Sequence, residues 1–393
     1  MVNEALAELL FAAARGVVEQ GVTYPPTYDL PPPVIATLGP LSAALLRDEP
    51  DQQAARRCVE ALEALPPSKV DSVYSALGVW VSMLEWVDAP LPKRRRNMFG
   101  WPVGAPVDTA TWRPRQPNRS KALSQLKRIP GLDVIFLFCP DGYIREAALK
   151  QLVSTRSAFV LTAVAYRLND WVGPVRLAAQ ACAMRVFASA PVDAVAEAAL
   201  FLTQRKSFWR RGEAEIALLD EAFARPDVVE ALAGLILSGR SGLVSRAFSH
   251  VLARDLLDHR LVEFATRAEN PAVRVIAART LIEGKASRRI GYDRQWIDKT
   301  YNLSRRVPRF ASRPIHRPQP VEALIALTAH DRSAAVRRVA AEGLVRLRRD
   351  IETPGLLLAM LKDDRSASIR RRIQFVADDL GLELSPASRS KGA

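Results

Sequence analysis

Residues 331–347 read DRSAAVRRVAAEGLVRL, and residues 364–376 read DRSASIRRRIQFV. The two phrases begin 33 positions apart and share an Asp, a β-branched residue and an Arg in the same order. Asp331 and Ser333 supply oxygens that can cap a helix N-terminus. The apolar positions after them have the spacing of one buried helical face: Val336, Val339, Ala340, Leu344 and Leu347. The phrase therefore predicts a helix that begins at an Asp-containing turn.

The same arrangement occurs in three earlier stretches: DGYIREAAL (141–149), DWVGPVRLAAQ (170–180) and NPAVRVIAARTL (270–281). The Arg of the five copies stands at Arg145, Arg176, Arg274, Arg337 and Arg370. Successive separations of 31, 98, 63 and 33 residues correspond to one, three, two and one units of roughly 31–33 residues. This period is typical of a stack of helix pairs.

These phrases resemble the second helix of HEAT and HEAT-like repeats, and the resemblance covers about residues 130–382. It implies an all-α fold, a right-handed α-solenoid of helix pairs. In that family the Asp and Arg form ladders between neighbouring repeats. We therefore expect the five arginines to be internal ladder residues rather than ligand contacts.

Charge is distributed unevenly along the 393 residues, whose formal net charge is +14. Residues 1–92 have a net charge of −7, residues 93–128 of +9, and residues 285–317 of +8. The composition, 49% hydrophobic and 25% charged, is ordinary for a folded protein. We predict four parts: an acidic helical region (1–92), a basic Pro- and Trp-containing loop or linker (93–128), a repeat array (129–382) with a basic insertion (285–320), and a flexible tail (383–393).

The two basic segments are predicted to be long loop insertions, because prolines and glycines exclude a continuous helix over 89–121 and loops of this length are usually functional or disordered. In the second segment the arginines are interleaved with Tyr292, Trp296, Tyr301 and Phe310. Arg contacts phosphates and aromatic rings stack on unpaired bases. The residues predicted to bind a polyanion are Arg94, Arg95, Arg96, Trp101, Trp112, Arg113, Arg115, Arg288, Arg289, Arg294, Trp296, Arg305, Arg306, Arg309, Arg313 and Arg317.

No phosphate-binding loop, nucleophile elbow, zinc-protease helix or EF-hand loop occurs in the sequence. The three cysteines are widely spaced without a CxxC pair, and the four histidines lack metal-ligand spacing. We predict no enzyme activity, no metal and no cofactor. HEAT-like solenoids also include DNA glycosylases that use tryptophans and a carboxylate. Asp170 with Trp171, or Trp209 beside Arg210 and Arg211, could supply those residue types, although we expect Trp171 to be a packing residue.

The sequence favours a non-catalytic, cytoplasmic scaffold or adaptor. Its repeat surface would bind a protein partner, alone or within a larger complex, and its basic segments would contact a polyanion. Largely sequence-independent binding of DNA or RNA is the alternative principal role, and a glycosylase-type enzyme is the second alternative. A membrane partner is not expected, because no stretch of 18 or more apolar residues occurs.

Overall fold

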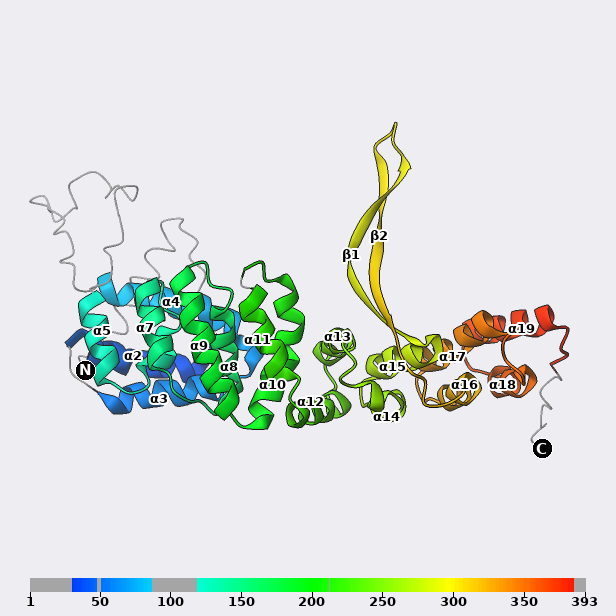
Figure 1. Ribbon diagram of the computed structural model, residues 1–393, viewed down its shortest axis with the longest axis horizontal. Helices are drawn as coiled ribbons and strands as arrows, with labels where there is room; N and C mark the ends of the chain where they lie inside the picture. Colours follow the sequence, from blue (N-terminus) through cyan, green and yellow to red (C-terminus); the bar gives the residue numbers. More distant parts are fainter. Residues whose placement is uncertain (1–29, 48–50, 87–118, 212, 385–393) are drawn as a thin grey trace, which may run out of the picture. The chain divides into compact units, whose positions relative to one another are not determined.

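The computed structural model of the protein describes residues 30–47, 51–86, 119–211 and 213–384 (Figure 1). Over these residues the chain is mostly helical, and its one sheet has two antiparallel strands. The helical prediction is therefore confirmed for the described chain. Most of the first basic segment and of the tail falls outside the described residues. Residues 119–128, which the sequence assigned to the loop or linker, form a helix instead.

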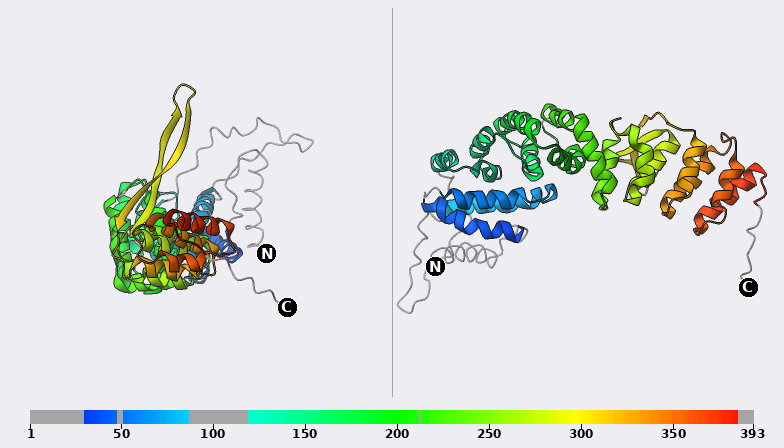
Figure 2. Two further views of the ribbon diagram at one scale, coloured as in Figure 1. Left: turned by 90° about the vertical axis from the view of Figure 1, so that its right-hand side faces the viewer. Right: turned by 90° about the horizontal axis from the view of Figure 1, so that it is seen from below.

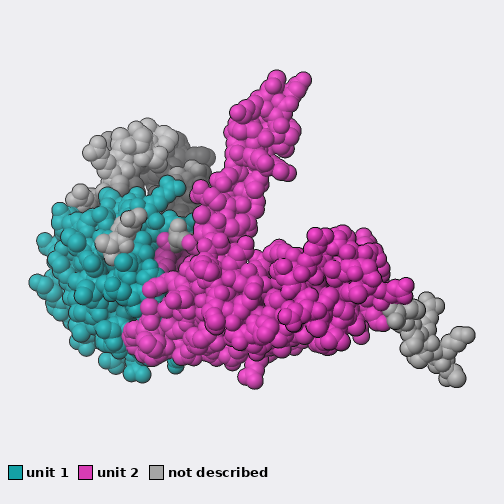
Figure 3. Space-filling view, turned by 45° about the vertical axis from the view of Figure 1, so that its right-hand side comes forward, with its two compact units in different colours: residues 1–198, 208–223 teal, residues 199–207, 224–393 magenta. Residues whose placement is uncertain are grey.

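The chain forms two compact units (Figure 3). Unit 1 comprises residues 1–198 and 208–223, and unit 2 comprises residues 199–207 and 224–393. Helix α10 (Val192–Arg205) and the 3-10 helix η4 (Lys206–Phe208) carry residues of both units.

Unit 1 is built around one buried helix, α8 (Ala158–Arg167). Tyr166 is the one residue of α8 that is not buried, as expected for a helix that is apolar all round. Helices α3, α4 and α9 contact it. The other elements of unit 1 are α2 (Pro32–Arg47), α3 (Gln52–Glu63), η2 (Pro67–Lys69), α4 (Val70–Trp86), α5 (Arg119–Arg128), α6 (Leu132–Phe136), α7 (Gly142–Gln151), α9 (Gly173–Ser189) and α11 (Glu213–Phe223).

Unit 2 contains two layers of helices and the sheet. The first layer is α13 (Gly242–Val251), α15 (Pro271–Glu283), α17 (Ala334–Leu347) and α19 (Ala367–Leu380); the second is α14 (Leu261–Arg267), α16 (Val321–Ala329) and α18 (Pro354–Leu361). Each first-layer helix contacts the next one in its layer, and α14, α16 and α18 do the same. The remaining elements are α12 (Pro226–Ser238), η5 (Asp258–Arg260), β1 (Lys285–Asp298) and β2 (Leu303–Pro314).

Close packing between α15 and α17 requires a residue without a side chain at Gly343. A Cβ atom built there would lie 2.7 Å from Cγ2 of Ile282, closer than real Cβ atoms approach. The small residues in the repeated phrase therefore let successive first-layer helices pack at short distance.

The repeated Arg connects neighbouring repeats through a forked ion pair. In unit 2, Arg274 donates from Nε and Nη2 to the two carboxylate oxygens of Asp331, at 2.8 and 3.1 Å. Its Nη1 donates to the carbonyl of Ala268 at 2.7 Å, in the turn before its own helix. Asp331 in turn accepts from the backbone N–H of Ser333 at 2.6 Å, just before α17. One Arg–Asp pair thus joins two repeats and orders two turns.

The same geometry recurs at Arg145 with Asp170 in unit 1, and at Arg337 with Asp364 in unit 2. The ladder prediction is therefore confirmed at Arg145, Arg274 and Arg337. Arg370 differs, since it is exposed and donates to the carbonyls of Asp364 and Arg365.

The Arg337–Asp364 pair predicts a specific pH dependence of stability. The hydrogen bonds from Arg337, with the N–H of Ser366, lower the pKa of the Asp364 carboxyl below its ordinary value of 3.8. A lowered folded pKa means stability that is present above about pH 4 and lost as the pH falls through the folded value. We expect the unfolding free energy of Asp364→Asn to change less than wild type between about pH 4 and 2.

Urea unfolding at each pH measures this difference. Asp363→Asn, at the exposed neighbouring position, is the control. An equal flattening in both variants would contradict the assignment to the Arg337 pair.

The second basic segment is a long β-hairpin, so the prediction of a loop insertion at 285–320 is wrong there. Figures 1 and 2 show β1 and β2 as a ribbon that stands away from the helices of their own unit. α15 ends at Glu283 and is capped by Gly284, whose φ of 67° is in the left-handed region; β1 begins at the next residue. The register breaks between Arg289 and Gly291 and again between Trp296 and Asp298. Each of these breaks is a β-bulge, which bends and twists a strand.

Candidate functional site

The hairpin register collects arginines and aromatic rings on one face. Residues paired across two strands share a face, and neighbours along a strand alternate between faces. Arg294 pairs with Arg306, and Arg289 pairs with Phe310. At the bulge after Arg289, Ile290 has no partner on β2, and the pairing resumes at Gly291 with Arg309. The even-numbered residues of β2 and their partners on β1 therefore lie on the same face along the whole hairpin. We name this set the arginine–aromatic face: Arg289, Tyr292, Arg294, Trp296, Arg306 and Phe310.

Contacts within the face hold the guanidinium groups beside the rings. The Arg294 guanidinium carbon lies 4.0 Å from the Trp296 ring centroid, and its Nε donates to Oγ of Ser304 at 2.8 Å. The guanidinium carbon of Arg289 lies 5.1 Å from the Tyr292 ring centroid. Such cation–π contacts reduce the freedom of a long side chain before a ligand arrives.

The rings remain accessible. Tyr292 is 53% exposed, Trp296 41% and Phe310 58%. The side chain of Arg306 makes no hydrogen bond or ion pair with any residue that the structure describes. The face therefore presents a guanidinium without a protein partner beside three exposed aromatic rings. Large apolar side chains that are exposed together are an informative feature of a folded protein.

The opposite face has fewer free groups. Arg305 donates from Nε to Gln295 at 2.8 Å, and Arg309 lies 3.6 Å from the carboxylate of Asp293. Both pairs are exposed and contribute little to stability. Because its arginines have partners on the hairpin, the opposite face serves as a matched control for substitutions on the arginine–aromatic face.

Three of the predicted contact residues position the hairpin instead. Arg313 donates two hydrogen bonds to Asp258, at 2.7 and 2.6 Å. Arg317 donates to the carbonyls of Leu281 and Ile282 at the end of α15, at 3.0 and 2.9 Å. Because their donors are used within unit 2, we leave both residues out of the candidate interface.

Arg288 is the third, and it contacts His250 of α13. Its Nη1 donates to Nδ1 of the ring at 3.2 Å. Burial, together with the positive charges of Arg288 and Lys206, lowers the pKa of His250 below 6.5. The ring is therefore neutral near pH 7 and can accept this hydrogen bond, which fixes the lower part of β1 against α13.

The remaining predicted contacts lie outside the described residues: Arg94, Arg95, Arg96, Trp101, Trp112, Arg113 and Arg115. The predicted set also omits Tyr292 and Phe310, which the register places on the arginine–aromatic face. Counting alternate positions along two paired strands would have found them, but only if the segment had been recognised as a hairpin.

The residues considered for glycosylase chemistry are not arranged as a site. Asp170 is buried and accepts from Arg145, Arg167 and the N–H of Val172. Its neighbour Trp171 is 70% exposed, so the prediction that it packs between repeats is wrong. Trp209 packs edge-on against Tyr166, with ring centroids 5.7 Å apart.

In the part of the chain that the structure describes, no three His, Cys, Asp or Glu side chains cluster as potential metal ligands. None of its helices combines the length and apolar composition needed to cross a bilayer.

Comparison with known proteins adds no assignment. No family model matches the chain, and no curated protein is significantly similar to it in sequence.

Proposed function

We propose that this is a non-catalytic, cytoplasmic nucleic-acid-binding protein of the HEAT-like class, a right-handed α-solenoid that uses its β-hairpin to hold single-stranded DNA or RNA. The observation that carries the proposal is the gathering of Arg289, Arg294 and Arg306 with three exposed aromatic side chains on one face of the hairpin. The stacked helix pairs and their Arg–Asp ladders support the HEAT-like architecture.

The chemistry of the face favours unpaired bases over a purely ionic partner. Arginines attract phosphates regardless of sequence, and this attraction weakens as salt rises. Exposed rings add stacking of about 1–3 kcal/mol per base, and every base has a face that can stack. A duplex hides its base faces, and an acidic peptide has none. Both would use the arginines and leave Tyr292 and Phe310 without a partner.

The test is fluorescence anisotropy of the full-length protein with labelled single-stranded DNA, single-stranded RNA and duplex DNA across a salt series. We expect the single strands to bind most tightly, and polyglutamate to be a poor competitor. Competition by polyglutamate as effective as that of an unlabelled single strand would instead favour an acidic protein partner. Undetectable binding of all three nucleic acids at low salt would overturn the proposal.

The ring contribution can be separated from the charge contribution. We expect Tyr292→Ala with Phe310→Ala to weaken single-strand binding by about tenfold or more, since loss of one stacked base costs about 1–3 kcal/mol. Duplex affinity and the salt dependence should change little, because no charge is removed. Phe208→Ala removes an exposed ring outside the hairpin and is the control. Equal losses for single and double strands would show that the rings do not stack on bases.

A protein-docking role is the second candidate, and a feature of unit 1 favours it. Tyr143 on α7, with Leu177 and Met184 on the neighbouring α9, are large apolar side chains that are exposed. Leu177 and Met184 are seven residues, or about two helical turns, apart and therefore lie on the same side of α9, as the side chains of an interaction surface do. Leu177→Asp with Met184→Asp should abolish co-purification of a protein partner without affecting nucleic-acid binding. A partner retained by this variant would argue against that surface.

A further inference from the structure

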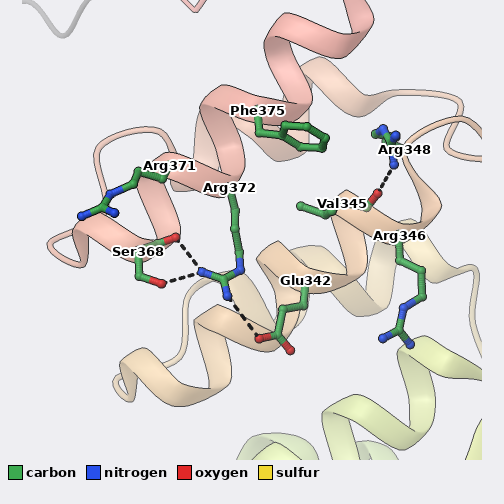
Figure 4. Close-up of a pocket in the computed structure, with 8 residues that line it drawn as sticks. All are labelled: Glu342, Val345, Arg346, Arg348, Ser368, Arg371, Arg372 and Phe375. Carbon is green, nitrogen blue, oxygen red and sulfur yellow. Dashed lines mark hydrogen bonds and ion pairs between the residues drawn. The ribbon is translucent and has the colours of Figure 1, made fainter. Parts of the chain in front are cut away.

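A basic groove lies on the first-layer helices at the C-terminal end of unit 2 (Figure 4). It has a volume of about 750 Å³ and is formed by α17, the residue that follows it, and α19. Figure 4 shows arginines from both helices around the hollow, with Phe375 above them. The arginines that line it are Arg346, Arg348, Arg371 and Arg372.

The groove continues toward the hairpin. A smaller hollow of about 140 Å³ shares Glu342 and Arg346 with it and is also lined by Arg279 and Lys285. Lys285 is the first residue of β1. Basic side chains therefore follow the first layer from the foot of the hairpin, over α15 and α17, to α19.

Acidic partners balance only part of this charge. Glu342 is shared between Arg279, at 3.3 Å, and Arg372, at 3.8 Å. Arg346 pairs with Glu283 at 2.7 Å, yet its side chain is 59% exposed. The side chain of Arg371 makes no ion pair or hydrogen bond with any described residue. The ladder does not use these side chains, so their clustering is not explained by repeat stacking.

Arg348 and Phe375 complete the groove. The Arg348 guanidinium is held by Asp379 at 2.7 Å and lies 5.4 Å from the Phe375 ring centroid. The ring is half-exposed. The groove thus repeats the combination of arginine and aromatic ring found on the hairpin.

We propose that this groove is a second contact surface, which binds the phosphate backbone of the same nucleic-acid strand that the hairpin holds. The inference rests on the proposed function. Once the hairpin holds a strand, the neighbouring phosphates are presented to the groove at high effective concentration, so weak individual contacts add to the affinity. Arg371 and Arg346 supply the exposed charge, and Phe375 supplies a surface for one base or sugar.

The test compares two double variants of the full-length protein with equal charge change. Arg346→Gln with Arg371→Gln removes two groove cations, and Arg240→Gln with Arg267→Gln removes two exposed cations of unit 2 that do not line either hollow. The probe is single-stranded DNA of about 30 nucleotides, which exceeds the roughly 4–16 nucleotides that one OB fold covers and is long enough to reach two surfaces.

For the groove variant we expect the slope of log affinity against log salt to fall by about 1.4, at about 0.7 per phosphate contact, and affinity near 0.15 M salt to fall roughly tenfold. The control should match wild type, and thermal unfolding followed by circular dichroism should show both variants folded.

The two proposals fail in different ways. If neutralising the arginine–aromatic face weakens binding while the groove variant matches its control, the groove proposal is wrong and the proposed function stands. If wild type does not bind the probe, both are wrong. Equal losses in the groove variant and its control would show a general effect of net charge and overturn the groove.

Discussion

Replacing Arg274 with alanine is expected to lower the free energy of unfolding of unit 2 by about 3–5 kcal/mol, the cost of removing one partner of a buried ion pair. Arg274 is 1% exposed, and its guanidinium donates hydrogen bonds to both carboxylate oxygens of Asp331. Without it, the largely buried carboxylate of Asp331 loses the guanidinium that donates to both of its oxygens, and the carbonyl of Ala268 loses its donor. An uncompensated buried charge costs more than the pair contributed, which is why the effect is large.

The last repeat provides the matched control. Arg370 occupies the same position of the repeated phrase, but it is exposed and bonds to carbonyls with no carboxylate in its fork. We expect Arg370→Ala to cost about 1 kcal/mol or less. Urea unfolding measures the loss in both variants. Because the two units can unfold separately, hydrogen exchange of the unit 2 amides is followed as well. Similar losses of unfolding free energy at the two positions would show that burial of the Arg–Asp pair does not determine how much it stabilises the fold.

Neutralising the arginine–aromatic face is expected to weaken single-strand binding roughly 50-fold near 0.15 M salt. The change is Arg289→Gln, Arg294→Gln and Arg306→Gln, and the magnitude follows from three phosphate contacts at about 0.7 each in the salt slope. The slope itself should fall by about 2. The loss extends beyond charge, because Arg294 also covers the ring of Trp296.

The control uses the same hairpin. Lys299→Gln, Arg305→Gln and Arg309→Gln remove the same charge from the turn and the opposite face. Anisotropy titrations should show less than about a threefold change for this variant. If both triple variants bind the single strand equally weakly, the net charge of the hairpin determines the affinity, and the arginine–aromatic face is not the binding surface. Arg313 is kept in both variants, since its contacts with Asp258 anchor β2.

The repeated phrase predicted the helical elements well because their determinants are local. The apolar spacing from Val336 to Leu347 corresponds to α17, and Ser333 caps this helix as its position suggested. The Arg of the phrase was expected to be internal, and Arg274 and Arg145 are among the most buried large side chains in the described chain. Helix spacing and caps depend on residues within a few positions of each other, so a single sequence contains them.

The hairpin and the groove could not be predicted in the same way. Strands β1 and β2 are exposed on both faces, so they lack the alternation of apolar and polar residues that marks a half-buried strand. Their identity depends on pairing between residues as far apart as Lys285 and Pro314, and the bulge at Ile290 decides which side chains share a face. The groove unites Arg346 and Arg371 from different repeats, a combination without any sequence spacing to reveal it.

By itself the sequence predicted a helical fold with an arginine at the same position of each copy of the repeated phrase, and two segments of concentrated positive charge. Only the tertiary structure decided which arginines are available. It assigns Arg145, Arg274 and Arg337 to the ladders and Arg313 and Arg317 to the foot of the hairpin, and it leaves Arg306 and Arg371 exposed without a partner among the described residues. The physical reason is that an arginine's role depends on which carboxylates and carbonyls surround it, and most of these groups come from other repeats.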